Sequence, residues 1–514
     1  MAYLVEQKVG NHVYLYEVES YWDPDKKQPR QRRKYLGRKD PETGQPQPAR
    51  RGGWPRASRD FGHVYLLEEL SRRAGLTDVL TAVYGDEAGL LLDLAMYQVA
   101  EAKPLYLFQS WREGVRSEAG GASSQRLSEW VRSWGRRSGE REQFLRQWAA
   151  RAGGVEGVVF DVTSLSSYSR LVDLLEWGYN RDGDGLPQVN VGLVYGQPAN
   201  VPIAYRVWPG SVPDVSSLDL TATLLAEYGL ARLAFVLDRG FYSAANLARL
   251  AGSQHRFLLP LPLTTKLARQ LLAAHRKALA SPERAFRFQE RSQYHLRVET
   301  AVGSVPLTAH LFYDGRRKAD EEARLIGRLV ELERRAAEHK GRRRAAVARF
   351  LNQSWRGSRR LYTLTLDRGE VVLRRKSKAI SRLINRMGYV IHLTNDAARE
   401  RDEVLRLYAR RDRVEKLFDV LKNELIEGRL RVSSREALEG RLFLAFLALV
   451  LHSLLDNAMR DRELYKQWSV AEVLAELKKL RRIEMSSGRT YLTEITKKQR
   501  TLFEKLNIPI PKST

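Results

Sequence analysis

The chain has 514 residues, and its 87 Lys and Arg against 61 Asp and Glu give a formal net charge of +26. Such a basic chain favours a polyanionic partner, and nucleic acid is the commonest one. Its 43% hydrophobic content excludes a disordered basic tail, and the lack of cysteine excludes a disulfide framework, a thiolate zinc site and a cysteine nucleophile.

Nothing in the chain indicates secretion or membrane insertion. The first residues lack a basic region followed by an apolar run and a cleavage site. The longest apolar run, Leu442–Leu451, is bounded by Arg441 and His452 and is too short to cross a bilayer. We therefore expect a cytoplasmic protein that meets DNA or RNA and makes no membrane contact.

Residues 1–55 are predicted to form a basic N-terminal hairpin segment and a linker. Tyr14, Tyr16 and Val18 alternate as in a strand, and Lys26–Lys39 carries eight basic residues and no acidic one. Pro41–Pro55 is rich in Pro and Gly, which favours a linker. The basic run is either a solvated hairpin or a contact for phosphates, and its composition leaves both readings open.

Residues 56–152 are predicted to form a helical domain. Apolar residues recur at helical spacing in Val64–Leu70, Leu90–Val99 and Leu127–Trp134. No helix-turn-helix pattern stands out, so the expectation that this domain binds DNA ends depends on its position and on the charge of the chain.

An α/β pattern begins in residues 153–264, the first part of the predicted catalytic core. Expected strands are Val158–Phe160, Val189–Tyr195, Val201–Trp208, Leu233–Leu237 and Phe257–Leu259, with helices at Ser216–Tyr228 and Ala244–Ala251. Three adjacent strands followed by strands alternating with helices predict a mixed sheet.

Residues 265–385 interrupt this pattern and are predicted to be an inserted subdomain. Tyr294–Val298 and Val305–Leu311 alternate across Gly303-Ser304 as a hairpin, and residues 317–351 form a long charged helix or a helix pair. The second part of the core is expected at 386–460, with a strand at Tyr389–Leu393 and helices at 400–427 and 437–458. A basic tail occupies 461–514.

The helix expected at 400–427 carries a polar constellation. Tyr408, Arg411, Glu415 and Lys422 fall at about 0°, −60°, −20° and −40° around a regular helix, so they share one narrow stripe beside its apolar face. A carboxylate flanked by two cations and a phenol suits a phosphate and metal site. Surface ion pairing would explain the same spacing, and the nearby Asp412 and Asp419 mean that geometry alone does not single out Glu415.

Asp161 and Asp238 each end an expected apolar strand. If the two strands are neighbours, both carboxylates lie at one edge of the sheet, and a divalent cation relieves their repulsion. A third carboxylate from a helix would complete an all-oxygen site, which favours Mg²⁺ or Mn²⁺ over zinc. Asp is also common at strand ends as a turn former, so these residues alone are weak evidence.

The order of these motifs resembles the RNase H-like core of DDE transposases. The spacing Tyr-x2-Arg-x3-Glu-x6-Lys in YARRDRVEKLFDVLK resembles the Tyr-Arg-Glu-Lys signature of the insertion-sequence-four group. FDVTS around Asp161 and LDRGFYS around Asp238 are similar to the first and second Asp motifs of that group, and YVIHLTN also resembles it. The segments YEVESYWDPDKKQPRQRRKYLGR and GYNRDGDGLPQVNVGLVY resemble its 1634-type branch.

The resemblance implies a metal-dependent DNA transposase. Asp161, Asp238 and Glu415 would be catalytic and would hold two Mg²⁺ or Mn²⁺ ions for in-line attack on phosphorus. Tyr408, Arg411 and Lys422 would bind DNA phosphates. The implied fold is an RNase H-like core of mixed sheet and flanking helices, interrupted by a strand-rich insertion and preceded by a helical domain.

The implied partners are double-stranded DNA, as terminal inverted repeats and as target, and a second copy of the chain in a synaptic homodimer. Two alternatives remain: a structure-specific nuclease on the same core that never joins ends, and a non-enzymatic, transposase-derived DNA-binding repressor. The three converging carboxylates argue against the repressor, because a protein kept only for binding has no use for them.

Overall fold

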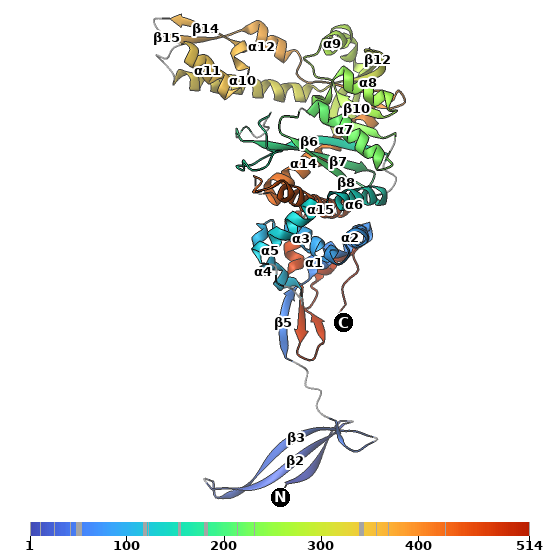
Figure 1. Cartoon of the computed structure of the whole chain (residues 1–514), viewed down its shortest axis with the longest axis vertical. Helices are drawn as coiled ribbons and strands as arrows, with labels where there is room; N and C mark the ends of the chain where they lie inside the picture. Colours follow the sequence, from blue (N-terminus) through green and yellow to red (C-terminus); the bar gives the residue numbers. More distant parts are fainter. Residues whose placement is uncertain are drawn as a thin grey trace.

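The computed structural model describes residues 2–10, 12–24, 26–41, 43–47, 54–116, 121, 123–152, 156–178, 183, 185–212, 214–230, 232–338, 344–355, 357–367, 370–426 and 428–512. A nine-stranded mixed sheet lies at the centre (Figure 1). Its strands, in spatial order, are β11 (Ala285–Phe288), β12 (Arg291–Val302), β13 (Val305–Tyr313), β16 (Tyr389–Thr394), β10 (Arg256–Pro260), β9 (Ala234–Leu237), β6 (Gly157–Ser166), β7 (Gln188–Gln197) and β8 (Val201–Pro209). The α/β class predicted from the sequence is confirmed.

The strands β6, β9 and β10 run parallel, and the other neighbours in the sheet are antiparallel. Every residue of β6 and β7 is buried, as in strands whose two faces are both covered by other elements. The expectation that the first strand ends at Asp161 is wrong. The strand continues to Ser166 because β7 pairs beside it along its whole length, as far as Gln188.

The predicted hairpin at residues 294–311 is present as β12 and β13, and it extends the central sheet. Residue 265 therefore does not mark a change of sheet. A separate apolar cluster begins further along the chain, where Leu325, Leu329 and Leu332 lie on one face of a helix and are buried. The elements around this cluster project from the body in Figure 1. They are α10 (Gly315–Ala337), α11 (Arg344–Ser354), β14 (Tyr362–Asp367), β15 (Glu370–Arg375) and α12 (Ser377–Ile384).

Helices cover both faces of the central sheet. On one face α6 (Ser138–Arg151) and α15 (Arg435–Asp461) contact β8, and α14 (Arg411–Asp419) contacts β6. On the other side lie α7 (Asp214–Glu227), α8 (Ala244–Gly252) and α9 (Lys266–Leu279), of which α8 contacts β10 and α9 contacts β13 (Figure 1).

A layer of helices packs on the far side of α15, away from the sheet. Its members are α1 (Gly62–Ala74), α2 (Leu76–Tyr84), α3 (Ala88–Glu101), α4 (Phe108–Val115) and α5 (Ser124–Arg136). The helices α5 and α15 approach closely at two glycines. A Cβ atom on Gly135 would overlap the carbonyl oxygen of Glu436, and one on Gly440 would overlap that of Val131. The two backbones therefore touch where a larger residue does not fit.

The apolar character of α15 follows from burial on two sides. By length and composition the helix could span a membrane, since its most apolar window has a mean hydropathy of 1.8. However, 72% of that window is buried inside the protein, between the helical layer and the sheet. The helix expected at 437–458 is thus confirmed, and its length and hydropathy are those of a buried core helix.

The C-terminal segment returns to the start of the helical layer. It contains α16 (Val470–Lys478), β17 (Arg481–Met485), β18 (Thr490–Leu492) and α17 (Lys497–Lys505), and β17 pairs with β5 (Pro55–Asp60). The backbone N–H groups of Phe61 and Gly62 both donate to the carbonyl oxygen of Leu480, at 3.0 Å each.

The first residues form a separate antiparallel sheet, seen apart from the body in Figure 1. Its strands are β1 (Ala2–Val9), β2 (His12–Asp23), β3 (Gln28–Lys39) and β4 (Pro46–Gln47). The basic run predicted at Lys26–Lys39 lies mostly in β3, where Arg30, Arg32 and Lys34 are exposed. Residues 48–53 of the predicted linker lie outside the described residues.

Candidate active site

The two aspartates of the predicted site lie side by side on neighbouring strands. β6 and β9 run parallel, with Phe160 opposite Leu237. Asp161 follows Phe160 within β6, and Asp238 is the first residue after β9. The parallel register therefore brings the two carboxylates to the same position along the sheet, as expected from the sequence.

Local hydrogen bonds orient both carboxylates. Oδ1 of Asp161 accepts the backbone N–H of Val162 at 2.9 Å. Oδ1 of Asp238 accepts the backbone N–H of Arg239 at 2.6 Å, at the start of a short 3₁₀ turn. Asp161 is buried, whereas a third of the Asp238 side chain is exposed, so the first acid is held more rigidly than the second.

The helix predicted at 400–427 is not one regular helix, which corrects the straight-helix geometry. α13 (Arg401–Ala409) ends at Arg410, α14 follows, and Val420–Leu425 forms a π-helical turn, η6. At Arg410 the N–H donates to Leu407 at 3.2 Å, three residues back, and the side chain donates to Gln197 Oε1 at 3.0 Å. After Asp419 the backbone hydrogen bonds span five residues instead of four. Lys422 therefore no longer falls on the stripe calculated for a regular helix.

Arg411, the first residue of α14, brings the three predicted acids together. Its Nη2 lies 3.1 Å from Oδ2 of Asp161 and 2.9 Å from Oε1 of Glu415. Its Nη1 lies 3.2 Å from Oδ1 of Asp238. The family resemblance implied that this arginine binds DNA phosphates, whereas here its guanidinium is the common partner of all three carboxylates.

Burial and charge act in opposite directions at this cluster. Burial raises the pKa of Asp161, against the opposing effects of Arg411 and the Val162 N–H. Burial also acts to lower the pKa of Arg411, but the carboxylates of Asp161 and Asp238 outweigh it, so that pKa is raised. The guanidinium therefore stays charged and partly compensates three acids that would otherwise repel one another.

The rings of Tyr408 and His392 pack against each other, and the Tyr408 hydroxyl contacts Arg411. The Tyr408 hydroxyl accepts a hydrogen bond from Nη1 of Arg411 at 3.2 Å, and its ring centroid lies 4.4 Å from that of His392. Burial raises the pKa of Tyr408 and lowers that of His392 to about 3. Sequence reasoning did not place His392 at the site, although the residue lies within the YVIHLTN motif on β16.

The structure distinguishes Glu415 from the acids near it on the helix. Glu415 contacts Arg411, whereas Asp412 pairs with Lys416 at 2.6 Å on the exposed side. Asp419 is also exposed. Lys422 is half-buried in the π-helical turn.

The donor set fits a hard divalent cation. Asp161 and Glu415 contact the same Nη2 atom, so their oxygens lie no further apart than the sum of those two distances. Three carboxylates supply the all-oxygen ligands that Mg²⁺ and Mn²⁺ prefer. In the described part of the chain no group of three or more acidic or imidazole side chains is arranged to hold a metal directly. The three acids of this site each contact Arg411 instead.

Comparison with known families identifies a domain that contains these acids. The family described as "Transposase DDE domain" matches residues 154–451, more than half of the chain, and this match includes all three acids. A piggyBac transposase, in a cryo-EM structure of its synaptic complex with hairpin DNA, is similar over 81% of this chain and 70% of that chain, with 10% identity and a TM-score of 0.34. No curated protein matches significantly. The chain belongs to the DDE transposase family.

Proposed function

We propose that this transposase cuts DNA at the ends of an insertion sequence and joins those ends to target DNA, using two Mg²⁺ or Mn²⁺ ions held by Asp161, Asp238 and Glu415. The observation that carries the proposal is the convergence of these acids, from two strands and a helix far apart in the chain, on one guanidinium. Three acids that meet beside two central strands of the sheet, within a matched DDE domain, are suited to metal-assisted phosphoryl transfer.

The acids of the site would hold the metal ions, and the basic residues would hold the DNA. Bound divalent ions supply an activated oxygen nucleophile and stabilise the departing oxygen. Asp161, buried and hydrogen-bonded, provides the fixed ligand, and the exposed Glu415 provides one that can adjust. Arg411 would turn from the carboxylates to a DNA phosphate, which its planar fork can hold in bidentate fashion. Tyr408 would orient that arginine, and Lys422 would add a point charge along the bound strand.

Finer assignments follow from the sequence resemblance and are part of the proposal. They are membership of the Tyr-Arg-Glu-Lys group and its 1634-type branch, an RNase H-like core, DNA-end binding by the helices of residues 56–152, and a homodimer in the synaptic complex. The cytoplasm of a bacterial or archaeal cell is the proposed site of action. The net charge of +26 supports a DNA partner.

The test uses a plasmid that carries the gene with its natural flanking DNA. With Mg²⁺ the purified protein should release the element and join it to a second plasmid, and EDTA should stop both steps. A pre-cut end separates the alternatives: cutting without joining would indicate a nuclease, and binding without either reaction would indicate a repressor. Either result would overturn the proposed function.

A further inference from the structure

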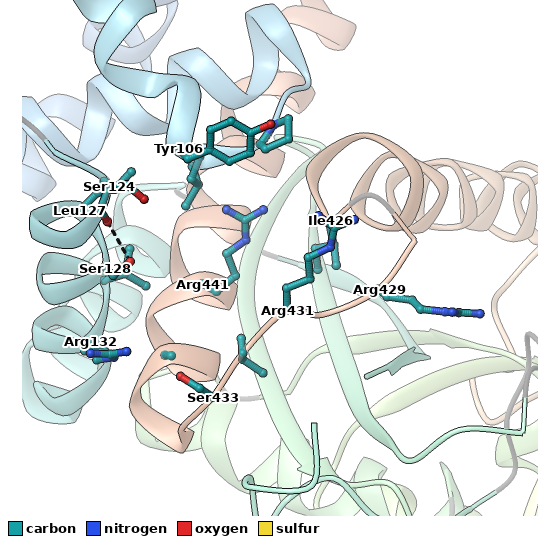
Figure 2. A pocket seen from close by; sticks show the side chains of 15 residues that line it. Tyr106, Ser124, Leu127, Ser128, Arg132, Ile426, Arg429, Arg431, Ser433 and Arg441 are labelled. Carbon is teal, nitrogen blue, oxygen red and sulfur yellow. Dashed lines mark hydrogen bonds between the residues drawn. The ribbon is translucent and has the colours of Figure 1, made fainter. Parts of the chain in front are cut away.

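A cavity of about 260 Å³ lies between α5, the first turns of α15 and the segment that joins η6 to α15. Figure 2 shows the side chains of Arg431 and Arg441 extending into this space below Tyr106, with Ser128 and Arg132 of α5 on the opposite wall. We call it the arginine cavity. The metal site does not use it, and it lies next to the close crossing of α5 and α15.

The lining of the arginine cavity carries charge of one sign. Arg132, Arg429, Arg431 and Arg441 line it, and its described lining residues include no Asp or Glu. A larger cavity of about 520 Å³ near the first residues of β6 and β9 also contains arginines, but there they are mixed with acids such as Glu156, Asp396 and Glu403. A cavity lined by cations alone favours an anionic occupant.

The four arginines differ in how they are held. Arg441 donates from Nη2 to the carbonyl oxygen of Leu425 at 3.0 Å, and Arg429 lies 4.5 Å over the ring of Tyr168. Arg132 and Arg431 are exposed, and neither has a salt bridge within 4 Å in the described part of the chain. Two cations therefore shape the cavity, while two more keep donors available for a bidentate contact with phosphate.

Two hydrogen bonds join the segment that carries Arg429 and Arg431 to the end of β6, the strand that carries Asp161. The N–H of Leu430 donates to the carbonyl oxygen of Ser166 at 2.9 Å, and the hydroxyl of Ser167 donates to the carbonyl oxygen of Leu430 at 2.7 Å. Ser166 is the last residue of β6, five residues beyond Asp161. Along an extended strand this is about 17 Å, or about five base-pair steps of duplex DNA. One duplex is long enough to reach both places.

We propose that the arginine cavity binds a backbone phosphate of the DNA whose end is placed at Asp161, Asp238 and Glu415. The inference depends on the proposed function and adds the path of the DNA over the protein surface: away from the acids, in the direction in which the buried strand β6 runs, and over the junction of α5 with Arg431. Since phosphates are the same in every sequence, this contact sets the position of the duplex without reading its bases.

A crosslinking experiment tests the location directly. The chain has no cysteine, so Ser433→Cys places a single thiol at the cavity. Labelled there with a photoactivated azide and mixed with a short DNA duplex, this variant should crosslink to DNA, and adding Arg132→Gln and Arg431→Gln should suppress the product. Ser377→Cys, exposed at the start of α12, is the matched control and should give little product. Equal yields from the two thiols would overturn the proposal.

A salt titration with the same duplex tests the phosphate contact. Arg132→Gln and Arg431→Gln should each weaken binding several-fold and make the slope of log affinity against log salt shallower by about 0.9. Arg349→Gln removes an exposed arginine of α11 that has no salt bridge to another described residue, and it should leave the slope unchanged. The same loss from all three variants would mean general charge attraction and would overturn the cavity site.

The two proposals fail in different ways. Cleavage of the natural flanking DNA by the unmodified protein, with no special effect of the cavity variants on binding, would overturn the cavity site alone. A specific crosslink at position 433, with no cleavage or joining by the unmodified protein, would overturn the proposed function alone and leave a protein that holds a DNA phosphate without cutting.

Discussion

The guanidinium of Arg411 lies 3.1 Å from the carboxylate of Asp161, a residue 250 positions earlier in the chain. This contact connects a helix to the middle of a buried strand at the centre of the molecule. Since the same side chain also reaches the other two acids of the site, it keeps three repelling carboxylates together without a metal.

Removal of any one of the three acids should stop catalysis. Asp161→Asn, Asp238→Asn and Glu415→Gln each remove a charged oxygen ligand, so metal-dependent cleavage should fall by at least about 100-fold. Cleavage of the flanking DNA in Mg²⁺ measures the effect. Asp412→Asn, on the exposed side of the same helix, should retain activity. Full activity in Glu415→Gln, with loss in Asp412→Asn, would show that the helix ligand is misassigned.

Replacement of Arg411 should make the fold depend on divalent cations. Arg411→Gln leaves three acids without their shared cation, and the free energy of unfolding should fall by about 3 kcal/mol in EDTA. Mg²⁺ should then raise the midpoint of thermal unfolding more in the variant than in the unmodified protein, because it takes over the neutralising role. Equal shifts in the two proteins would contradict competition between Arg411 and the metal.

The two glycines at the crossing of α5 and α15 should not tolerate replacement by a residue with a side chain. Gly440→Ala forces a Cβ atom into the carbonyl of Val131, so the free energy of unfolding should fall by about 2 kcal/mol or more. Gly327→Ala is the control, because this exposed glycine within α10 has open space around its Cβ position, and alanine there should stabilise by about 1 kcal/mol. Denaturant titration of both variants measures the contrast. A neutral Gly440→Ala would show that the helices can separate.

Two histidines in contact, one buried and one partly buried, should make the fold sensitive to acid. His295 and His310 share a 3.0 Å contact, and burial lowers their pKa values from 6.5 to about 3 and about 4. Below about pH 6.5 the unfolded chain takes up these protons and the folded chain does not. The contribution of the two neutral histidines to the free energy of unfolding is therefore complete above pH 6.5. It is lost as the pH falls towards 4, by up to about 1.4 kcal/mol per pH unit for each histidine.

His310→Gln tests this acid sensitivity. Urea unfolding between pH 7 and pH 4.5 should show a shallower loss of stability in the variant than in the unmodified protein. His12→Gln, which changes an exposed histidine of the separate N-terminal sheet, should keep the original slope. If both variants lose stability as steeply as the unmodified chain, His310 does not cause the acid sensitivity.

The sequence predicted most strands and helices because the apolar runs are long and their periods are clear. It also predicted that Asp161 and Asp238 would be neighbours, since both follow short apolar runs and parallel strands align such positions. What it could not show is register: Asp161 lies inside β6 because β7 runs beside it, and nothing local to FDVTS indicates that pairing.

The helix that carries Glu415 shows a second feature that the sequence alone could not predict. A regular period predicts a common stripe for Tyr408, Arg411 and Glu415, and the structure does bring these side chains together. The turn at Arg410 depends on Gln197, a residue distant in the chain, and the later π-helical turn removes Lys422 from the calculated stripe. The shared contacts of Arg411 likewise exist only in three dimensions.

The placement of α15 also decides when the protein can fold during synthesis. The helices α1–α5 leave the ribosome early, but α1, α3 and α5 also pack against α15 or α16, which are made some hundreds of residues later. Until then the apolar faces that meet α15 and α16 lack their partners, and the strand partner of β5 does not yet exist. A nascent or truncated chain that lacks the final segment would therefore be a target for chaperones and proteases, and only the finished polypeptide can assemble the whole enzyme.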